Sequence, residues 1–221
     1  MIDPPVLGRL MPWLARIALA IAVVCAVLLA RRRAEYKPVA WALGAIGVAN
    51  VVRPILFVLV MDPAMRGGRL PFQGAERLAF HVEQICFLVW PFGVAALAAA
   101  VFLAPRRWPA VAVLGAYVVS VGVVMAGYPT IRQDLLASVY LGLTLGCLAV
   151  ALASVIWRWR APVPIAPPEI AALLLVVFLL GTVLGPYAIG RVDSGWAIGG
   201  GLFAGLFGLL ASLEVAWLRR R

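Results

Sequence analysis

Long apolar runs separated by short polar links extend over nearly the whole chain. A helix needs about 20 predominantly apolar residues to cross a hydrocarbon core of about 30 Å. Seven runs of about this length cover residues 11–30, 38–61, 78–104, 109–128, 135–157, 168–190 and 195–218. The runs are continuously apolar, whereas the strands of a membrane barrel alternate over segments of about 10 residues. The pattern predicts an all-α, polytopic integral membrane bundle with seven transmembrane helices.

Two polar links are long enough to describe. The longest, DPAMRGGRLPFQGAER at 62–77, is expected to form an external loop between the second and third spans. The link RAPVPIAPPE at 160–169 carries four prolines and is expected to be a stiff, extended connector before the sixth span. With links this short, residues 1–221 are predicted to form a single transmembrane domain with no soluble domain.

The composition supports a membrane-embedded protein and excludes several other classes. Hydrophobic residues make up 65% of the chain and charged residues only 13%, whereas soluble domains are about 45–50% apolar. The formal net charge is +10, but the basic residues are scattered as short clusters between apolar runs instead of forming one basic face. This distribution indicates a lipid bilayer as the partner and argues against nucleic acid.

The distribution of basic residues also predicts an orientation. Eleven of them lie in the odd-numbered links and at the C-terminus, and seven lie in the N-terminal segment and the even-numbered links. Because basic residues are enriched in cytoplasmic loops, the N-terminus is expected outside and the C-terminus in the cytoplasm. The predicted location is the inner (plasma) membrane of a bacterium.

Several polar side chains fall inside the second and third spans. Arg53 lies about 12 Å below the outer surface, at 1.5 Å per residue, and Glu83 lies at a similar depth in the next span. Ionisable groups inside a membrane are costly unless they are paired or hydrated, so an ion pair between them is predicted. Asn50, His81 and Gln84 accompany them and complete a candidate site for ligand binding or proton coupling.

This polar group admits two readings. In the first, it faces a cavity that opens outward, where Arg53 holds a small anionic or protonatable solute and Glu83 or His81 exchanges a proton. In the second, it is an interhelical clamp without a ligand. A small-solute or proton-coupled transporter therefore competes with a seven-helix sensory or scaffold protein that acts through a membrane partner. A lipid-modifying enzyme is the least supported class.

Small residues recur at spacing four in the last span, a pattern that lets helix backbones approach closely. These helix-packing candidates are Gly195, Gly199, Gly201, Gly205 and Gly208. Gly142 and Gly146 in the fifth span repeat the spacing. The pattern fits packing within one compact bundle, a homodimer interface or a hinge.

The residue inventory limits cofactor and metal chemistry. The chain has one histidine and three cysteines, Cys25, Cys86 and Cys147, and no Cys/His spacing typical of a metal site. Its one lysine, Lys37, lies in the first cytoplasmic link, so a retinal Schiff base in the last span is excluded. We therefore expect no cofactor, no metal and no catalytic residues.

Overall fold

The computed structural model describes residues 4–68, 73–126, 133–162 and 165–188, and all regular structure in these ranges is helical. The seven α-helices are α1 (Pro4–Arg32), α2 (Lys37–Leu56), α3 (Asp62–Arg66), α4 (Gly74–Phe102), α5 (Trp108–Ala126), α6 (Gln133–Trp159) and α7 (Pro167–Ala188). A 3₁₀ turn, η1 (Ala34–Tyr36), precedes α2, and a π-helical turn, η2 (Phe57–Met61), follows it. The all-α class is confirmed for these residues.

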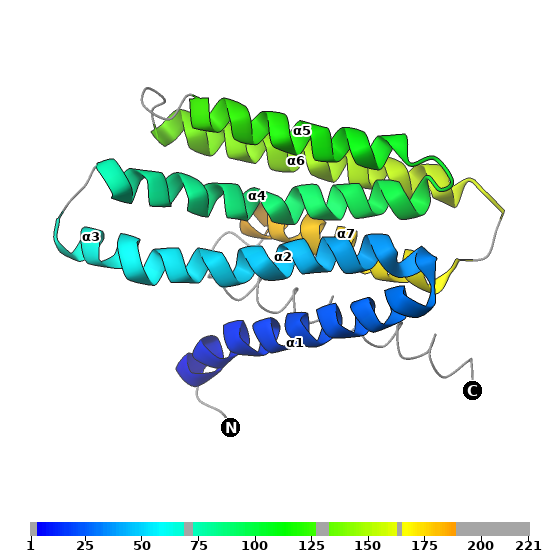
Figure 1. Ribbon diagram of the computed structural model, residues 1–221, viewed down its shortest axis with the longest axis horizontal. Coiled ribbons are helices and arrows are strands. Elements are labelled where there is room, and N and C mark those ends of the chain that lie inside the picture. Colours follow the sequence, from blue (N-terminus) through cyan, green and yellow to red (C-terminus); the bar gives the residue numbers. More distant parts are fainter. Residues whose placement is uncertain (1–3, 69–72, 127–132, 163–164, 189–221) are drawn as a thin grey trace.

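Successive long helices run back and forth along the long axis of the bundle (Figure 1). Helix α4 lies between α2 on one side and the pair α5 and α6 on the other, while α7 passes behind it and α1 packs against α2. The link from α1 to α2, the link from α4 to α5 and the link from α6 to α7 all lie at one end of the bundle. The links after α3 and after α5 lie at the opposite end.

Helix α4 owes its central position to small side chains. Its run Val94–Ala99 is buried throughout and contains four alanines. Gly93 in the same helix lies against Ile46 of α2, where an added Cβ would be 3.5 Å from the isoleucine side chain. Small residues let helix axes approach closely in an apolar environment. This run of small side chains therefore lets α4 lie in contact with α2, α5, α6 and α7.

Two clusters of buried apolar residues flank α4. The larger cluster joins α1, α2, α4, α6 and α7, and the smaller one joins α4, α5 and α6. Leu43 and Ile46 of α2 and Leu175 and Leu179 of α7 are among the most fully buried side chains of the larger cluster. Packing on both faces of α4 holds its polar N-terminal half at a fixed position between α2 and α6.

Four helical stretches in the described residues are long and apolar enough to cross a membrane. They are Ala34–Arg66, Gly74–Phe102, Trp108–Ala126 and Ser138–Trp159. They correspond to the second to fifth predicted spans, and α1 and α7 occupy the places of the first and the sixth. A shorter apolar segment of α7 covers Pro167–Gly181. The seventh predicted span, 195–218, lies outside the described residues.

The second span is longer and less regular than the hydrophobic pattern indicates. The helix continues through η2 into α3, so the N-terminal third of the link predicted as an external loop is helical. Pro54 lies inside α2 and lacks the amide hydrogen that would bond to the carbonyl of Asn50. The π-helical turn begins three residues later, and such turns are common where the regular helical hydrogen-bond pattern is disturbed. This irregular region immediately follows Arg53.

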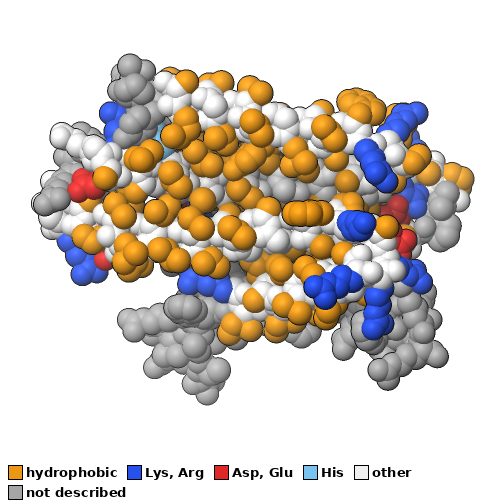
Figure 2. Space-filling model, in the orientation of Figure 1, with side chains coloured by type: hydrophobic (Ala, Val, Ile, Leu, Met, Phe, Trp, Pro, Cys, Tyr) orange, Lys and Arg blue, Asp and Glu red, His pale blue; other side chains and the backbone are white. Residues whose placement is uncertain are grey.

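The surface separates into an apolar middle and charged ends. In Figure 2 hydrophobic side chains cover the middle of the visible face, and most Lys and Arg side chains lie toward the two ends. Trp41, Trp108, Trp157 and Trp159 are exposed near the end that holds the α1–α2, α4–α5 and α6–α7 links. Exposed tryptophan at helix ends is typical of a membrane–water interface. We refer to this end as the basic end, after its cluster of Lys and Arg side chains.

Candidate functional site

The predicted ion pair between the second and third spans is present. Arg53 on α2 donates a hydrogen bond from Nε to Oε1 of Glu83 on α4. The Glu83 side chain is only 9% exposed, whereas the Arg53 side chain is 46% exposed. The carboxylate is therefore buried between the helices and the guanidinium lies at their edge.

Neighbouring side chains on α4 complete the surroundings of the pair. Gln84 donates a hydrogen bond from Nε2 to Oε2 of Glu83 at 2.7 Å, so both carboxylate oxygens accept a hydrogen bond. The guanidinium carbon of Arg53 lies 5.1 Å from the centre of the Phe87 ring, a cation–π contact. Within the described residues, these contacts leave the two terminal nitrogens of Arg53 without a protein acceptor. Two donors of a fixed positive charge are thus available to an anion.

Asn50 and His81, the other two predicted members, are placed differently. Asn50 donates a hydrogen bond from Nδ2 to the backbone carbonyl of Ile46 at 2.9 Å, within its own helix. His81 is buried, at 2% exposure, and its ring meets the ring of Phe80 edge to face. It precedes Glu83 by two residues, which is about 200° around a helix axis. The structure therefore brings Arg53, Glu83 and Gln84 together and directs His81 to another side of α4.

Tyr140 of α6, which the sequence places near the outer surface, also belongs to this region. Its side chain is buried at 7% exposure, and its hydroxyl has no hydrogen-bond partner in the described residues. The charge of Glu83 acts on this hydroxyl and on the thiol of Cys86. A buried donor without a partner is uncommon, and one that experiences the charge of a buried carboxylate is suited to a ligand or a proton. No pattern in α6 distinguishes Tyr140 from an interfacial tyrosine.

A second buried ion pair, which the hydrophobic pattern does not predict, lies at the basic end. Nε of Arg158 at the end of α6 donates to Oε1 of Glu169 at the start of α7, and its Nη2 donates to Oε2 at 3.0 Å. The two side chains are 17% and 10% exposed. The sequence signal was an acidic residue directly after the two prolines that begin a helix, because Glu is favoured in the first turn.

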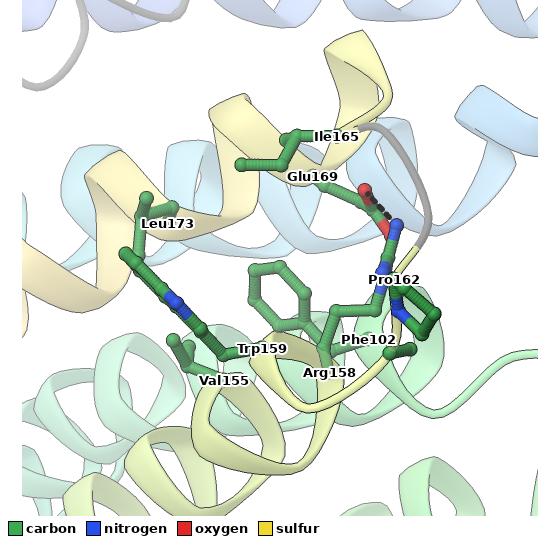
Figure 3. Close-up of a pocket in the computed structure, with 9 residues that line it drawn as sticks. Phe102, Val155, Arg158, Trp159, Pro162, Ile165, Glu169 and Leu173 are labelled. Atoms are coloured by element: carbon green, nitrogen blue, oxygen red, sulfur yellow. Dashed lines mark hydrogen bonds and ion pairs between the residues drawn. The ribbon is translucent and has the colours of Figure 1, made fainter.

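A pocket of about 360 Å³ adjoins this second pair. Figure 3 shows Trp159 and Leu173 on one side of it, and Arg158, Glu169 and Pro162 on the other. The pocket thus combines apolar walls with one charged edge. It lies at the opposite end of the bundle from Glu83, since α4 runs from Gly74 at one end to Phe102, a lining residue, at the other.

Two of the glycine candidates, Gly142 and Gly146, lie in the part of the chain that the structure describes. Gly195, Gly199, Gly201, Gly205 and Gly208 lie outside the described residues. For Gly142 and Gly146 of α6, an added Cβ would meet no heavy atom within 4 Å. These two glycines therefore do not mark a close helix contact within the described part of the bundle. Close approaches occur instead at Gly93, against Ile46, and at Gly47, where an added Cβ would lie 3.5 Å from the side chain of Val23.

The described residues define the class of the protein: they are all-helical, and their several long apolar helices are those expected of a membrane-embedded protein. Comparisons with protein-family models, with curated proteins and with solved structures find no match. Among the described residues, no group of three or more His, Cys, Asp and Glu side chains is arranged to hold a metal ion. The two ion pairs are therefore the features of the described residues that bear on function.

Proposed function

We propose that the protein is a multi-pass transporter of a small anionic or protonatable solute, with its binding site at Arg53 and Glu83 between α2 and α4. The observation that carries this proposal is a buried carboxylate paired with a half-exposed arginine inside two apolar helices. Charged groups at such positions face the interior of a bundle or a water-filled cavity, and they mark ion and substrate pathways in membrane proteins.

The arrangement suits exchange of a ligand. A solute carboxylate or phosphate would be held by the terminal nitrogens of Arg53, in the planar geometry that guanidinium groups offer to such anions. Because Nε of Arg53 donates to Glu83, a solute that draws the guanidinium toward itself weakens this ion pair, and Glu83 is the group that we propose to exchange the coupled proton. Binding of an anion and uptake of a proton are thereby coupled through one residue pair, which is the requirement for proton-coupled transport.

The proposal also includes the number of membrane spans and their orientation. We infer seven spans, with the basic end in the cytoplasm and the Arg53–Glu83 site nearer the outside. The support for the orientation is the excess of basic residues at that end. In this orientation the site lies at the external end of α4, where an outward-open cavity would admit solute.

Native mass spectrometry of the protein released from mild detergent tests the binding site. The paired variant Arg53→Gln/Glu83→Gln removes the site without leaving one charge buried alone. The matched control is Asp62→Asn/Arg66→Gln, because these residues form an ion pair at 2.7 Å at the same end of the bundle, but with an exposed arginine. We expect a small anionic adduct on the wild type and on the control, and its loss from the Arg53→Gln/Glu83→Gln variant.

Transport itself needs a second step. The compound released from the wild-type complex is added to proteoliposomes under a pH gradient, and we expect uptake by the wild type and none by the Arg53→Gln/Glu83→Gln variant. A wild type without adduct, or an adduct that survives in that variant, would contradict the proposed site. An adduct that binds but does not cross the membrane would favour the second candidate, a sensory protein that detects the solute at this ion pair.

A further inference from the structure

The pocket at the basic end is built from three helix ends and from the link between α6 and α7. Phe102 comes from the end of α4, Val155, Arg158 and Trp159 come from the last turns of α6, and Glu169 and Leu173 come from the first turns of α7. Figure 3 shows the side chains of Trp159 and Leu173 facing the Arg158–Glu169 pair across the pocket, with Phe102 behind. One part of the pocket is therefore apolar and the other part ends at charged groups.

The charges around the pocket favour an anion. The described residues of the basic end include eight basic side chains: Arg31, Arg32, Arg33, Lys37, Arg106, Arg107, Arg158 and Arg160. Against them stand two acidic ones, Glu35 and Glu169. Glu169 is neutralised by Arg158 through two hydrogen bonds, and its Oε2 also accepts from the backbone N–H of Ala166 at 2.8 Å. The acid in the pocket wall thus adds little negative potential, and the surrounding excess is positive.

The depth of the pocket in the membrane favours a lipid over a soluble anion. Trp157 and Trp159 are exposed at 60% and 75%, and large exposed tryptophans locate the headgroup level of a bilayer. A molecule that fills apolar walls at this level and carries a negative charge at its polar end has the chemistry of an anionic phospholipid. Basic pockets between membrane helices on the cytoplasmic side are suited to such headgroups.

We propose that this pocket binds one anionic phospholipid. One acyl chain lies against Val155, Trp159 and Leu173, and the phosphate lies at the charged edge beside Arg158 and Arg160. The site lies at the other end of the bundle from the solute site proposed above and shares no residue with it. Lipid held here joins the ends of α6 and α7, and it therefore stabilises the contact between them.

Purified protein in mild detergent, titrated with phosphatidylglycerol or with phosphatidylcholine, tests the proposal. The readouts are lipid adducts in native mass spectra and the shift in thermal unfolding temperature. Leu173→Trp fills the apolar part of the pocket without a change of charge. The matched control is Val177→Trp, one turn further along α7, where the side chain is 56% exposed and is not among those that line the pocket.

We expect one phosphatidylglycerol to be retained by the wild type and by Val177→Trp, with a raised unfolding temperature, and to be lost from Leu173→Trp. Arg160→Gln alters an exposed side chain, so it tests the site even if Leu173→Trp fails to fold. It should weaken phosphatidylglycerol binding about fivefold, the effect of one basic residue near an anionic surface. Equal retention of phosphatidylcholine, or wild-type behaviour of both Leu173→Trp and Arg160→Gln, would overturn the proposal. Inorganic phosphate should give no shift, and a shift with phosphate alone would also overturn the lipid assignment.

Discussion

The two partners of the Arg53–Glu83 pair differ in burial, and this difference determines what each contributes. Glu83 is enclosed between α2 and α4, while nearly half of the Arg53 side chain surface is exposed. An arginine at the edge of a bundle extends toward the interface when it loses its partner. A buried carboxylate cannot reach the interface in this way, so the loss of its partner leaves it in an apolar environment.

We predict that the two single replacements differ in stability. Arg53→Gln should lower the free energy of unfolding by about 3 kcal/mol, because it strands a buried carboxylate. Glu83→Gln should cost about 1 kcal/mol, as for a largely exposed pair, because the stranded guanidinium is half-exposed. The Arg53→Gln/Glu83→Gln variant should be more stable than Arg53→Gln alone. Denaturant unfolding in detergent micelles measures all three, and simple additivity of the two single effects would show that the residues do not interact.

The unpartnered hydroxyl of Tyr140 leads to a separate prediction. Tyr140→Phe should leave the free energy of unfolding unchanged or raise it by up to about 1 kcal/mol, since it removes a buried polar group that makes no hydrogen bond to any described residue. Tyr117→Phe is the control, because the Tyr117 hydroxyl donates to the carbonyl of Ile85 and its removal should be destabilising. A clear loss of stability in Tyr140→Phe, measured by thermal unfolding, would mean that the hydroxyl has a partner in the membrane.

At the scale of the helix, the start of α7 explains how Glu169 is held. Ala166 occupies the N-cap position, Pro167 and Pro168 form the first helical positions, and Glu169 is the third. The backbone N–H of Glu169 donates to the carbonyl of Ala166 at 2.9 Å, and the Glu169 carboxylate accepts from the N–H of Ala166. This is the acidic half of a capping box, to which Ala166 contributes no side-chain acceptor.

Completion of that capping box should stabilise the protein. In Ala166→Ser, the new hydroxyl can accept from the N–H of Glu169, the first available donor because Pro168 has none. We expect a gain of about 0.5–1 kcal/mol in the free energy of unfolding, the usual value of an N-cap side chain. Ala153→Ser, an exposed position inside α6, is the control and should not be stabilising. Thermal unfolding distinguishes the two, and an unchanged or lower melting temperature in Ala166→Ser would contradict the proposed cap.

The sequence predicted individual helices well and their neighbours poorly, for a physical reason. Continuous apolar runs reveal where a helix can cross a membrane, so α2, α4, α5 and α6 were predictable within a few residues. A run that is apolar on every side carries no stripe to show which face meets another helix. The central position of α4, and the close approaches at Gly93 and Gly47, therefore emerged only from the structure.

The sequence predicted one of the two ion pairs and not the other, again for a physical reason. Arg53 and Glu83 were predictable because they are charges inside apolar runs joined by a short link, and the structure pairs them. Arg158 and Glu169 lie where charges are expected, at helix ends, so nothing in the sequence separated a buried pair from a solvated one. The burial of Tyr140 was not predictable either, because a sequence does not distinguish an interfacial tyrosine from a buried one.

At the scale of the whole molecule, both proposals depend on one orientation. Anionic lipid is concentrated in the cytoplasmic leaflet, so the lipid pocket requires the basic end to face the cytoplasm. The proposed solute site lies toward the opposite end, and uptake from outside requires that end to be external. The concentration of basic residues at one end of the bundle supports this orientation, because arginine and lysine clusters are retained on the cytoplasmic side during insertion.

Cysteine labelling of intact cells tests this orientation directly. The native residues Cys25, Cys86 and Cys147 lie within α1, α4 and α6 and are first replaced by alanine. A single cysteine is then introduced either by Gln73→Cys, before α4, or by Ala34→Cys, after α1, both at exposed positions. A membrane-impermeant thiol reagent should label Gln73→Cys in intact cells and Ala34→Cys only after permeabilisation. The reverse result would place the basic end outside and would contradict the orientation on which both proposed sites depend. If both cysteines were labelled in intact cells, the helices between them would not cross the membrane an odd number of times, and the four apolar helices would need a different arrangement in the bilayer.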